Sequence, residues 1–283
     1  MTNIFMRRLQ STDRQQVVSL WQEAFSDGER VINDFLEEIQ MDRTGFGAFT
    51  AAGTLVSMMF LIPAELYVQN QIAPCRYVYA VATAKTARNN GLMRRLHAFA
   101  ADQAKEEGAT ALLLVPAERS LFSLYQTLGY RTRFFLGERR VVCTDNHAVK
   151  LTPCTAEQFL QMRETLLRSH SISFDFSPEF QPMRYSLLKK TGVSFWTVRD
   201  DASCGYLCVE HRAQACVVLE TNLNGQAFSD ACGALAKRFG CRQIYATGTI
   251  GKMSPYGMIL PFFSSKSEKI PFFIDSYMNL MLN

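Results

Sequence analysis

Apolar residues in the first half of the chain recur with two different periods, and each period predicts one kind of element. Alternating or short unbroken apolar runs predict strands, whereas spacings of three and four residues predict helices. The strands are expected at 4–9, 46–51, 54–61, 76–83, 111–115 and 130–143, with 66–68 extending the third past Pro63. The helices are expected at 11–25, 28–41, 91–107 and 120–128. Because residues 111–115 are apolar throughout, that strand is expected to be buried on both faces.

The second half repeats this alternation. Its pattern predicts helices at 155–168 and 226–239, and strands at 193–199, 205–211, 215–221, 244–247, 258–262 and 277–282. The succession of three strands, a helix and a strand echoes the first half. Polar residues at 144–147 mark the expected boundary. We therefore predict a mixed α/β (α+β) fold with one domain at 1–145 and a second at 146–283.

The composition is that of a folded globular protein. Hydrophobic residues make up 48% of the 283 residues and charged residues 20%, which is enough apolar material for a core. A formal net charge of +4 is too small for the basic surface of a nucleic-acid-binding protein. No apolar run is long enough to predict a membrane span, and the N-terminus lacks the apolar segment of a secretory signal. We expect a cytoplasmic protein with no nucleic-acid or membrane partner.

Eight cysteines are spread along the chain, and no two of them form a CxxC pair. This spacing matches neither a zinc site nor a small disulfide scaffold. Cys204, Cys208 and His211 could meet a metal, but a four-residue spacing on a strand more simply places both thiols on one core face. Buried free thiols are the favoured interpretation, and no metal site is predicted.

The most informative stretch, residues 81–93, joins a strand to the start of a helix. A helix N-terminus offers unpaired N–H groups and a positive partial charge to an anion. Three residues there tolerate a positive φ and allow successive N–H groups to turn toward one ligand, namely Asn89, Asn90 and Gly91. Four basic side chains accompany them without any acid, namely Lys85, Arg88, Arg94 and Arg95. The stretch predicts either a pyrophosphate cradle or an ordinary solvated loop before a basic helix face.

A second signal follows the strand at 111–115. Pro116 breaks the chain, and a short helix from Ser120 carries Tyr125, four residues before Gly129. A phenol at that place could donate a proton to a leaving group. The alternative is that Tyr125 packs between its neighbours on the helix, with its hydroxyl at the surface.

Together, the two signals resemble the GCN5-related N-acetyltransferase (GNAT) superfamily over residues 1–143. Arg88-Asn-Asn-Gly91-Leu-Met93 matches the acetyl-CoA motif Gln/Arg-x-x-Gly-x-Gly/Ala at its first and fourth positions, with Met93 in place of the final small residue. Tyr125-x-x-x-Gly-Tyr130 then follows the next strand, as in the family. The resemblance implies a GNAT fold in the first half and acetyl-CoA as the co-substrate.

The resemblance also implies roles for individual residues. The acetyl-CoA-binding residues would be Val81, Ala82, Thr83, Arg88, Asn89, Asn90, Gly91, Leu92, Met93 and Ser120. Backbone N–H groups of 88–93 would hold the pyrophosphate, and the strand end at 81–83 would pair with the pantetheine arm and polarise the acetyl carbonyl. Tyr125 would be the general acid that protonates the departing thiolate after direct attack by a neutral amine.

The second half has the elements of another such sheet but not its motifs. At the corresponding place stands Thr221-Asn-Leu-Asn-Gly225, with no arginine at the matching spacing. We therefore expect a degenerate GNAT-like domain that completes the acceptor side without an acetyl-CoA of its own. By analogy with tandem bacterial members of the superfamily, the C-terminal carboxylate of Asn283 is a candidate catalytic base.

Acidic residues around the second predicted helix offer another way to bind an acceptor. They are Asp27, Glu29, Asp34, Glu37, Glu38 and Asp42, against Arg30 alone. They predict either an acidic wall that attracts a cationic amine or a solvated helix face. Glu65 and Glu118 are further candidates for a base.

Two functions of different classes remain open. The first is an N-acetyltransferase that acts on a primary amine of a small-molecule or peptidic acceptor. The second is a non-catalytic acyl-CoA-binding regulatory module, which Met93 in place of a small residue favours. Transfer of an aminoacyl group from tRNA is disfavoured because RNA binding draws on a broad basic surface. The sequence leaves the oligomeric state open, a homo-oligomer included.

Overall fold

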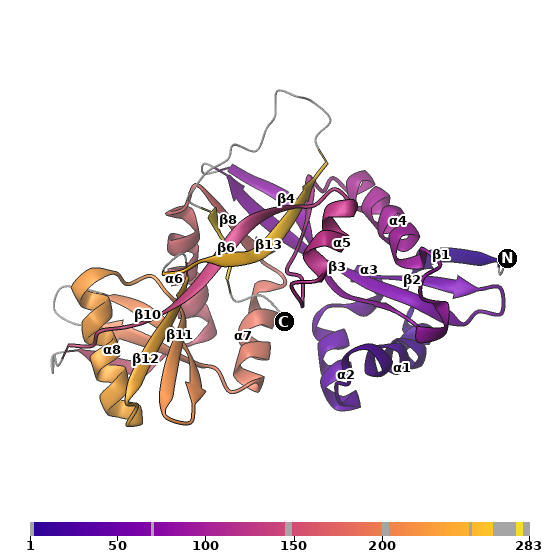
Figure 1. The fold of residues 1–283 in the computed structure, drawn as a ribbon. Helices are drawn as coiled ribbons and strands as arrows, with labels where there is room; N and C mark the ends of the chain where they lie inside the picture. The colour runs from indigo at the N-terminus through magenta and orange to yellow at the C-terminus, as the bar shows by residue number, and fades with distance from the viewer. Residues whose placement is uncertain are drawn as a thin grey trace.

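The computed structural model describes residues 3–68, 71–144, 149–199, 204–248, 251–262 and 276–279. Figure 1 shows the chain as two halves joined by long strands. The first half forms β1 (Ile4–Arg8), α1 (Arg14–Phe25), α2 (Glu29–Glu38), α3 (Met41–Thr44), β2 (Gly45–Thr50), β3 (Leu55–Val68), β4 (Gln71–Thr83), α4 (Leu92–Glu106), β5 (Ala111–Leu114), α5 (Leu121–Thr127) and β6 (Arg131–Arg140). Short 3₁₀ helices at Ser11–Asp13 and Lys85–Ala87 precede α1 and α4.

The second half contains a comparable set of elements. These are β7 (Lys150–Pro153), α6 (Ala156–Arg168), β8 (Ile172–Phe176), α7 (Gln181–Lys190), β9 (Ser194–Arg199), β10 (Cys204–Arg212), β11 (Ala215–Thr221), α8 (Gly225–Phe239), β12 (Gln243–Gly248), β13 (Ser254–Pro261) and β14 (Ser276–Tyr277). A mixed α/β fold is therefore confirmed.

The strands form one twisted mixed sheet whose order is nearly palindromic. The order is β1-β2-β3-β4-β5-β13-β6-β12-β11-β10-β9-β7, and β8 pairs with both β3 and β14 beside this path. Read from either end, an outer strand and an antiparallel meander lead to a parallel pair, which is β4 with β5 in the first half and β11 with β12 in the second. The strand order thus gives the two halves matching layouts.

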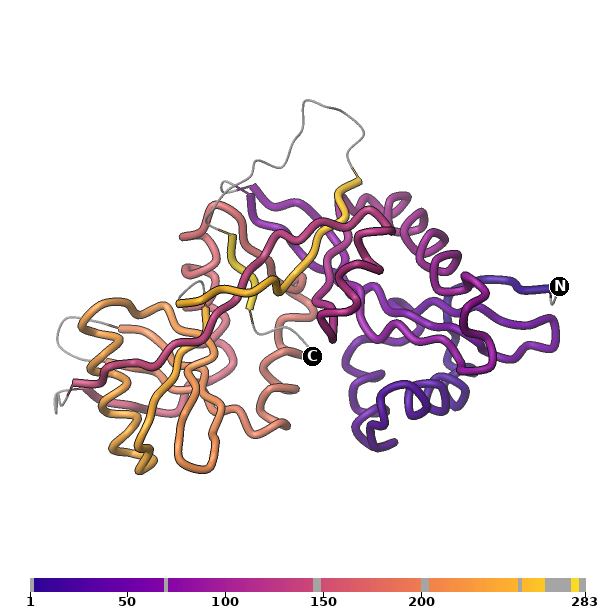
Figure 2. The backbone as a smooth tube through the Cα atoms, in the orientation of Figure 1, coloured from indigo at the N-terminus to yellow at the C-terminus, as the bar shows by residue number. Residues whose placement is uncertain are grey.

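The halves exchange strands at the centre of the sheet. β13 comes from the end of the chain but pairs antiparallel with β5, from Met258 opposite Leu114 to Pro261 opposite Ala111. β6 comes from the first half and pairs with β12. Figure 2 shows the tubes of β6 and β13 running side by side between the halves, as their mutual pairing requires. The split at residue 145 stays a prediction, and the pairing adds that β13 lies in the sheet of the first half.

Apolar residues cover both faces of the sheet in the first half of the chain. One buried cluster joins α1 and α2 to the sheet, with Trp21 and Leu36 among its members. The other lies under α4 and α5 and includes Leu96 and Tyr125. α4 presents buried residues at 92, 96, 97, 100, 101 and 104, which is the spacing of one helix face. Gly108, at φ +83°, follows its end as the predicted terminating glycine.

Most predicted elements of the first half are confirmed, and one needs correction. The expected helix at 28–41 is interrupted, because Gln40 adopts φ +53° and divides it into α2 and α3. The expected extension of the strand at 54–61 past Pro63 is confirmed, since β3 continues through Pro63 to Val68. β5 is buried at every position, as its unbroken apolar run predicts.

The second half holds three elements that the periodicity did not predict. They are β7, β8 and α7. α7 buries Met183 together with Arg184, and β8 buries Asp175 within an otherwise mostly apolar strand. A charge on the inner face breaks the binary pattern on which the prediction rests. The strand expected at 277–282 is described only as β14, at Ser276–Tyr277.

The cysteines are unbonded thiols in mixed surroundings. Five are buried, but Cys143 and Cys204 are exposed, so the expected pairing of Cys204 with Cys208 on one core face is wrong. Cys204 opens β10, where the strand is still at the surface. Within the described ranges, no group of three or more His, Cys, Asp or Glu side chains is arranged to hold a metal ion. No helix in the same part of the chain is long and apolar enough to cross a membrane.

Candidate active site

A cleft opens in the first half because two parallel strands part. β4 and β5 pair only at Arg76 opposite Leu112 and Tyr77 opposite Leu113. Just beyond, β4 carries one residue more than β3, and Ala80 there adopts φ +46°. Such a bulge bends the strand and turns its backbone groups. The backbone of 78–83 on the β5 side therefore faces a space rather than a strand.

The cleft has a volume of about 570 Å³ and draws on four parts of the chain. Its lining residues are Trp21, Phe25, Asp27, Val78, Tyr79, Ala80, Val81, Leu114, Val115, Pro116, Ala117, Glu118, Arg119, Leu121, Phe122, Tyr125, Pro255 and Tyr256. They come from the end of α1, from β4 and β5, from the segment around α5, and from β13. The exchanged strand thus supplies one wall, since β13 carries Pro255 and Tyr256.

The loop from β4 to α4 has the backbone conformation that the sequence predicts for an anion site. Asn89 adopts φ +62° and Gly91 φ +67°, both in the left-handed region. A Cβ built on Gly91 would meet no atom within 4 Å, so the space over this backbone is open. The first N–H groups of α4 have no carbonyl one turn earlier to bind. An anion could therefore approach the loop closely.

The basic side chains of the loop are exposed. Hydrogen bonds within the loop and to α5 hold some of its residues. Arg88 Nε donates to the Thr83 carbonyl at 3.1 Å, and Asn90 Nδ2 donates to the Arg88 carbonyl at 3.2 Å. Arg94 bridges to α5 through Thr127 Oγ1 at 3.3 Å. Lys85 and Arg95 are also exposed. This arrangement brings the predicted cradle residues together at one end of β4.

The remaining predicted cofactor-binding residues divide between cleft and core. Val81 lines the cleft, whereas Ala82 is buried in the core on the other side of β4. The Thr83 hydroxyl lies 2.9 Å from Ser57 Oγ. Leu92 is buried and Met93 is half-buried, so their side chains pack while their N–H groups face the start of the helix. For these positions the backbone, rather than the side chain, is the available contact.

Tyr125 lies in the cleft as a buried, protonated phenol. The residue is 8% exposed, and burial raises its pKa to about 12. Its ring meets that of Tyr130 edge-on, with centroids 5.6 Å apart. The Tyr130 hydroxyl lies 2.8 Å from His97 Nε2, so this neighbour is held in turn. Within the part of the chain that the structure describes, no hydrogen bond engages the Tyr125 hydroxyl.

Ser120 and Asn283 are found neither in the cleft nor in the loop before α4. Ser120 Oγ donates to Glu118 Oε2 at 3.1 Å, and Ser120 is not among the residues that line the cleft. Asn283 lies outside the described residues, so its assignment as a base stays a prediction.

The acidic candidates are scattered, and only two of them reach the cleft. Asp27 and Glu118 line it, and Asp27 Oδ2 accepts the indole N–H of Trp21 at 2.8 Å. Asp34, Glu37 and Glu38 instead surround a separate hollow with Lys190. Glu65 accepts a bond from the Tyr67 hydroxyl and is not part of the lining. The acidic segment is therefore mostly a solvated helix face, with Asp27 as its one contribution to the cleft.

Sequence reasoning missed the aromatic walls. Trp21 falls within the helix expected at 11–25, and Tyr256 falls just before the strand expected at 258–262. Trp21 contacts Tyr79 with ring centroids 6.1 Å apart, and Tyr256 arrives from the other half of the chain. The Trp21 position shows only the spacing of a core residue, and the arrival of Tyr256 depends on strand exchange, which no local pattern signals.

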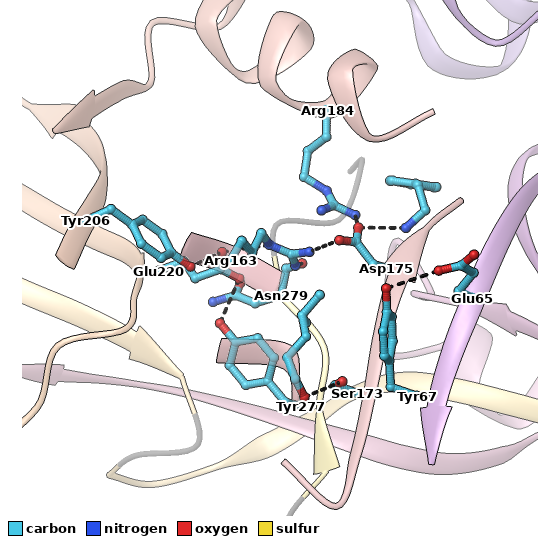
Figure 3. Close-up of polar contacts among 12 residues, drawn as sticks. Glu65, Tyr67, Arg163, Ser173, Asp175, Arg184, Tyr206, Glu220, Tyr277 and Asn279 are labelled. Carbon is cyan, nitrogen blue, oxygen red and sulfur yellow. Dashed lines mark hydrogen bonds and ion pairs between the residues drawn. The ribbon is translucent and has the colours of Figure 1, made fainter. Parts of the chain in front are cut away.

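A buried ionic cluster lies beside a strand bulge of the second half. β11 carries an extra residue beside β10, as β4 does beside β3, and Glu220 follows it. Arg163 Nε donates to the Glu220 carboxylate at 2.8 Å, and Arg163 Nη1 lies 2.5 Å from Asp175. The hydroxyls of Tyr206 and Tyr277 each donate to Glu220 at 2.8 Å. Figure 3 shows these side chains converging from separate elements, with Arg184 also on Asp175.

Comparison with known proteins finds a family match in the first half. Residues 6–133 match the family model described as the acetyltransferase (GNAT) domain. No curated protein matches the sequence. The resemblance predicted from the loop and Tyr125 is thus confirmed.

Solved structures of similar fold cover most of the chain. A GCN5-related N-acetyltransferase from Kribbella flavida has a TM-score of 0.73 at 14% identity and covers 91% of this chain and 71% of its own. A conserved protein from Enterococcus faecalis reaches a TM-score of 0.76 at 14% identity, over 92% and 73%. A GCN5-related N-acetyltransferase from Anabaena variabilis reaches 0.75 at 12% identity, over 91% and 72%. At these identities the likeness concerns the fold, and it extends through both halves.

Proposed function

We propose, on the premise that residues 6–133 form a GNAT acetyltransferase domain, that the chain transfers the acetyl group of acetyl-CoA to a primary amine by direct attack. The observation that carries the proposal is the parting of β4 from β5 over a protonated tyrosine. The cleft extends from Tyr125 to Val81 on the open edge of β4, and the basic loop at 84–91 directly follows the end of that strand. The loop could bind an anion, the edge of β4 an extended chain, and Tyr125 could donate a proton at the other end of the cleft.

The residues present fit acetyl-CoA. The left-handed residues Asn89 and Gly91 and the start of α4 suit a pyrophosphate, and nothing crowds the backbone at Gly91. Exposed Arg88 and Lys85 add positive charge. The open edge of β4 at Val81 offers main-chain groups to the amides of a pantetheine arm, and Ser120 stays a further candidate contact. Bound there, the co-substrate supplies an activated acetyl thioester.

The chain's own groups would act at three points of the reaction. Backbone N–H groups at the bulge of β4 stabilise negative charge on the acetyl oxygen, a contact whose loss typically costs 10²–10³-fold in rate. The neutral amine forms the new C–N bond as the C–S bond breaks. Tyr125 gives its phenolic proton to the departing sulfur, because a pKa of about 12 keeps that proton in place at neutral pH. Asp27 and Glu118 are the carboxylates at the cleft that can receive the amine proton.

We further propose that residues 146–283 are a degenerate GNAT-like domain without an acetyl-CoA of its own. The palindromic strand order and the bulge before Glu220 support descent from the same layout. The buried cluster around Arg163 lies beside the bulge of the second half. The domain still serves the first half, since β13 brings Tyr256 to the acceptor side.

A Tyr125→Phe substitution tests the reaction. Turnover with acetyl-CoA and a panel of primary amines should fall by about 10²-fold, while the thermal shift on adding acetyl-CoA persists. Tyr67→Phe is the matched control, because its hydroxyl bonds Glu65 away from the cleft. Unchanged turnover in Tyr125→Phe removes Tyr125 from the mechanism. Binding of acetyl-CoA by the unaltered chain with no turnover on any amine favours the non-catalytic acyl-CoA-binding module instead.

A further inference from the structure

The side of the cleft formed by α1 and β4 is built from aromatic rings. Trp21 is in contact with Phe25 at a centroid distance of 5.6 Å and with Tyr79 at 6.1 Å. Phe35 backs both Trp21 and Tyr79, at 5.3 and 5.0 Å. Tyr256 adds a further ring from β13. These mutually supporting rings form a preorganised surface for a flat apolar group.

Phe25 is unusual in this group because it lies open to the cleft. It is 41% exposed, although it belongs to a helix whose other large apolar residues are buried. α1 ends directly after it, and Ser26 adopts φ +61°, which turns the chain back on itself. A large ring held at the rim of a cleft by a rigid helix end offers contact area to a ligand at little entropic cost.

The same turn places one carboxylate among the rings. Asp27 follows Ser26 and lines the cleft. Its Oδ2 accepts the Trp21 indole N–H at 2.8 Å, which fixes the orientation of the group and leaves Oδ1 free for a second donor. A carboxylate beside aromatic faces is a strong combination for an ammonium ion, because the charge pairs with the oxygen while the rings contribute cation–π attraction.

The opposite wall adds no second strong site for a cation. Glu118 lines the cleft, but it accepts the Ser120 hydroxyl and is followed directly by Arg119, which also lines the cleft. The positive guanidinium offsets the negative carboxylate. An acceptor with several ammonium groups would therefore find one favourable position in the cleft and no charge match for the others.

We propose that the acceptor is a monoamine whose single ammonium group is carried on an aromatic ring system, with Asp27 as the residue that selects the charge and Phe25 as the residue that selects the ring. The inference rests on the proposed function, since it names the acceptor class for the same cleft. Asp27 binds the amine as its ammonium ion and holds it beside the path to Tyr125. The rings of α1 and β4 hold the aromatic body.

Binding can be measured without turnover through Trp21. The chain has two tryptophans, so Trp196→Phe leaves Trp21 as the only indole, directly bonded to Asp27. Fluorescence titrations in the presence of CoA would use 2-phenylethylamine, its neutral isostere 2-phenylethanol, spermidine and glucosamine. Calorimetry on the unaltered chain checks that Trp196→Phe has not disturbed the site. We expect 2-phenylethylamine to bind at least about tenfold more tightly than each of the other three.

Two substitutions with matched controls separate charge from ring. Asp27→Asn should remove the preference for 2-phenylethylamine over 2-phenylethanol, whereas Asp34→Asn, in the separate hollow, should keep it. Phe25→Leu should weaken 2-phenylethylamine binding by about fivefold. Phe239→Leu should not, although Phe239 is exposed to a similar degree in the second half. Equal effects of each substitution and its control would overturn the roles of Asp27 and Phe25.

The outcomes distinguish this inference from the proposed function. If spermidine or glucosamine is acetylated with a higher kcat/KM than 2-phenylethylamine, the acceptor class is wrong and acetyl transfer stands. If 2-phenylethylamine binds in the expected order but no amine is acetylated while acetyl-CoA binds, acetyl transfer is wrong and the ligand class stands. Tighter binding of 2-phenylethanol than of 2-phenylethylamine would overturn the assignment of charge to the site.

Discussion

The two halves of the chain share a strand order but differ at the parallel strand pair of each half. In each half a strand with an extra residue lies beside a parallel neighbour. β4 and β5 keep two registered pairs and then part, whereas β11 and β12 keep four. The first half has an open cleft beside its bulge, whereas beside the bulge of the second half Arg163 and Glu220 form a buried ion pair. A shared layout thus carries a site only where the space beside the bulge stays open.

The connections after these strands differ in the same sense. The loop after β4 runs from 84 to 91 and exposes Asn89 and Gly91 in left-handed conformations. The loop after β11 is residues 222–224, and Asn222 Oδ1 accepts the Tyr206 N–H. The side chain of Asn222 in the shorter loop is therefore used in a bond within the fold. The longer loop exposes backbone groups that could bind a ligand.

The largest effect is expected at the buried cluster of the second half. Arg163→Met removes the partner of two buried carboxylates and should lower the free energy of unfolding by about 3–5 kcal/mol. The carboxylates of Asp175 and Glu220 raise the pKa of Arg163 above its usual range despite the opposing effect of burial, so the guanidinium is charged in the fold. Urea unfolding followed by circular dichroism measures the change.

The control for this substitution is Arg168→Met, five residues further along in α6. Arg168 pairs with Glu164 at 2.8 Å on the exposed face of the helix, so its loss should leave the free energy of unfolding nearly unchanged. A loss below about 1 kcal/mol for Arg163→Met would mean that the cluster is not the support of the second half. The comparison between the buried cluster and the open cleft would then lose its energetic basis.

A pair of glycines provides the next test, because each opens the helix after its half's parallel strand. Gly91 has φ +67° and Gly225 φ +51°, and a Cβ added to either residue would meet no atom within 4 Å. Glutamate at Gly91 should abolish acetyl-CoA binding, whereas glutamate at Gly225 should leave it intact. Acetyl-CoA at 100 times its Kd stabilises a protein by about 2.7 kcal/mol, so the raised unfolding midpoint should vanish in the first variant only. Loss of the shift in Gly225→Glu alone would mean that acetyl-CoA binds in the second half, which contradicts the proposed site.

The sequence was sufficient for the parts of the molecule where local pattern and chemistry agree. α4, β5 and the turn residues Asn89 and Gly91 follow from periodicity and from tolerance of positive φ. Each of these depends on residues that are close together in the chain. The match to the GNAT family model could therefore be predicted from residues 81–130.

What could not be predicted depends on distant contacts. α7 buries Arg184, and β8 buries Asp175, so neither element shows a clean apolar face. Their charges are compensated by each other and by Arg163, which also pairs with Asp175. Tyr256 enters the cleft because β13 is exchanged between halves, a pairing over more than a hundred residues that no short pattern encodes. Buried charge and strand exchange are the two features that sequence pattern leaves out.

The first half buries a neutral imidazole, His97, whereas the second half buries paired ions. The stability of the first half should therefore depend on pH through His97. Burial, and then the charge of Lys105, lower the pKa of His97 to about 4 from its ordinary 6.5. Above pH 6.5 the imidazole is neutral in both states. Between pH 6.5 and 4 the unfolded chain binds a proton that the folded chain does not, so the free energy of unfolding decreases as the pH is lowered. The loss from this group should be about 2 kcal/mol at pH 5.

The His97 contribution can be isolated by substitution. His97→Gln keeps a polar partner for the Tyr130 hydroxyl but has no proton to gain, so its urea midpoint should depend less on pH between 6.5 and 5. His211→Gln, at the surface of the second half, should retain most of the dependence. The same slope in His97→Gln and in the unaltered chain would show that another group controls acid stability.

The smallest expected effect concerns how α6 begins, in the second half. Thr155 Oγ1 accepts the Gln158 N–H at 3.2 Å, and Gln158 Oε1 accepts the Thr155 N–H at 3.1 Å, which forms a capping box. Thr155→Ala should lower the free energy of unfolding by about 1 kcal/mol. Ser120 stands at the matching position of α5 without a capping bond, so Ser120→Ala should cost only a few tenths of a kcal/mol. Equal losses in Thr155→Ala and Ser120→Ala, measured by urea unfolding, would mean that the capping box does not stabilise the start of α6.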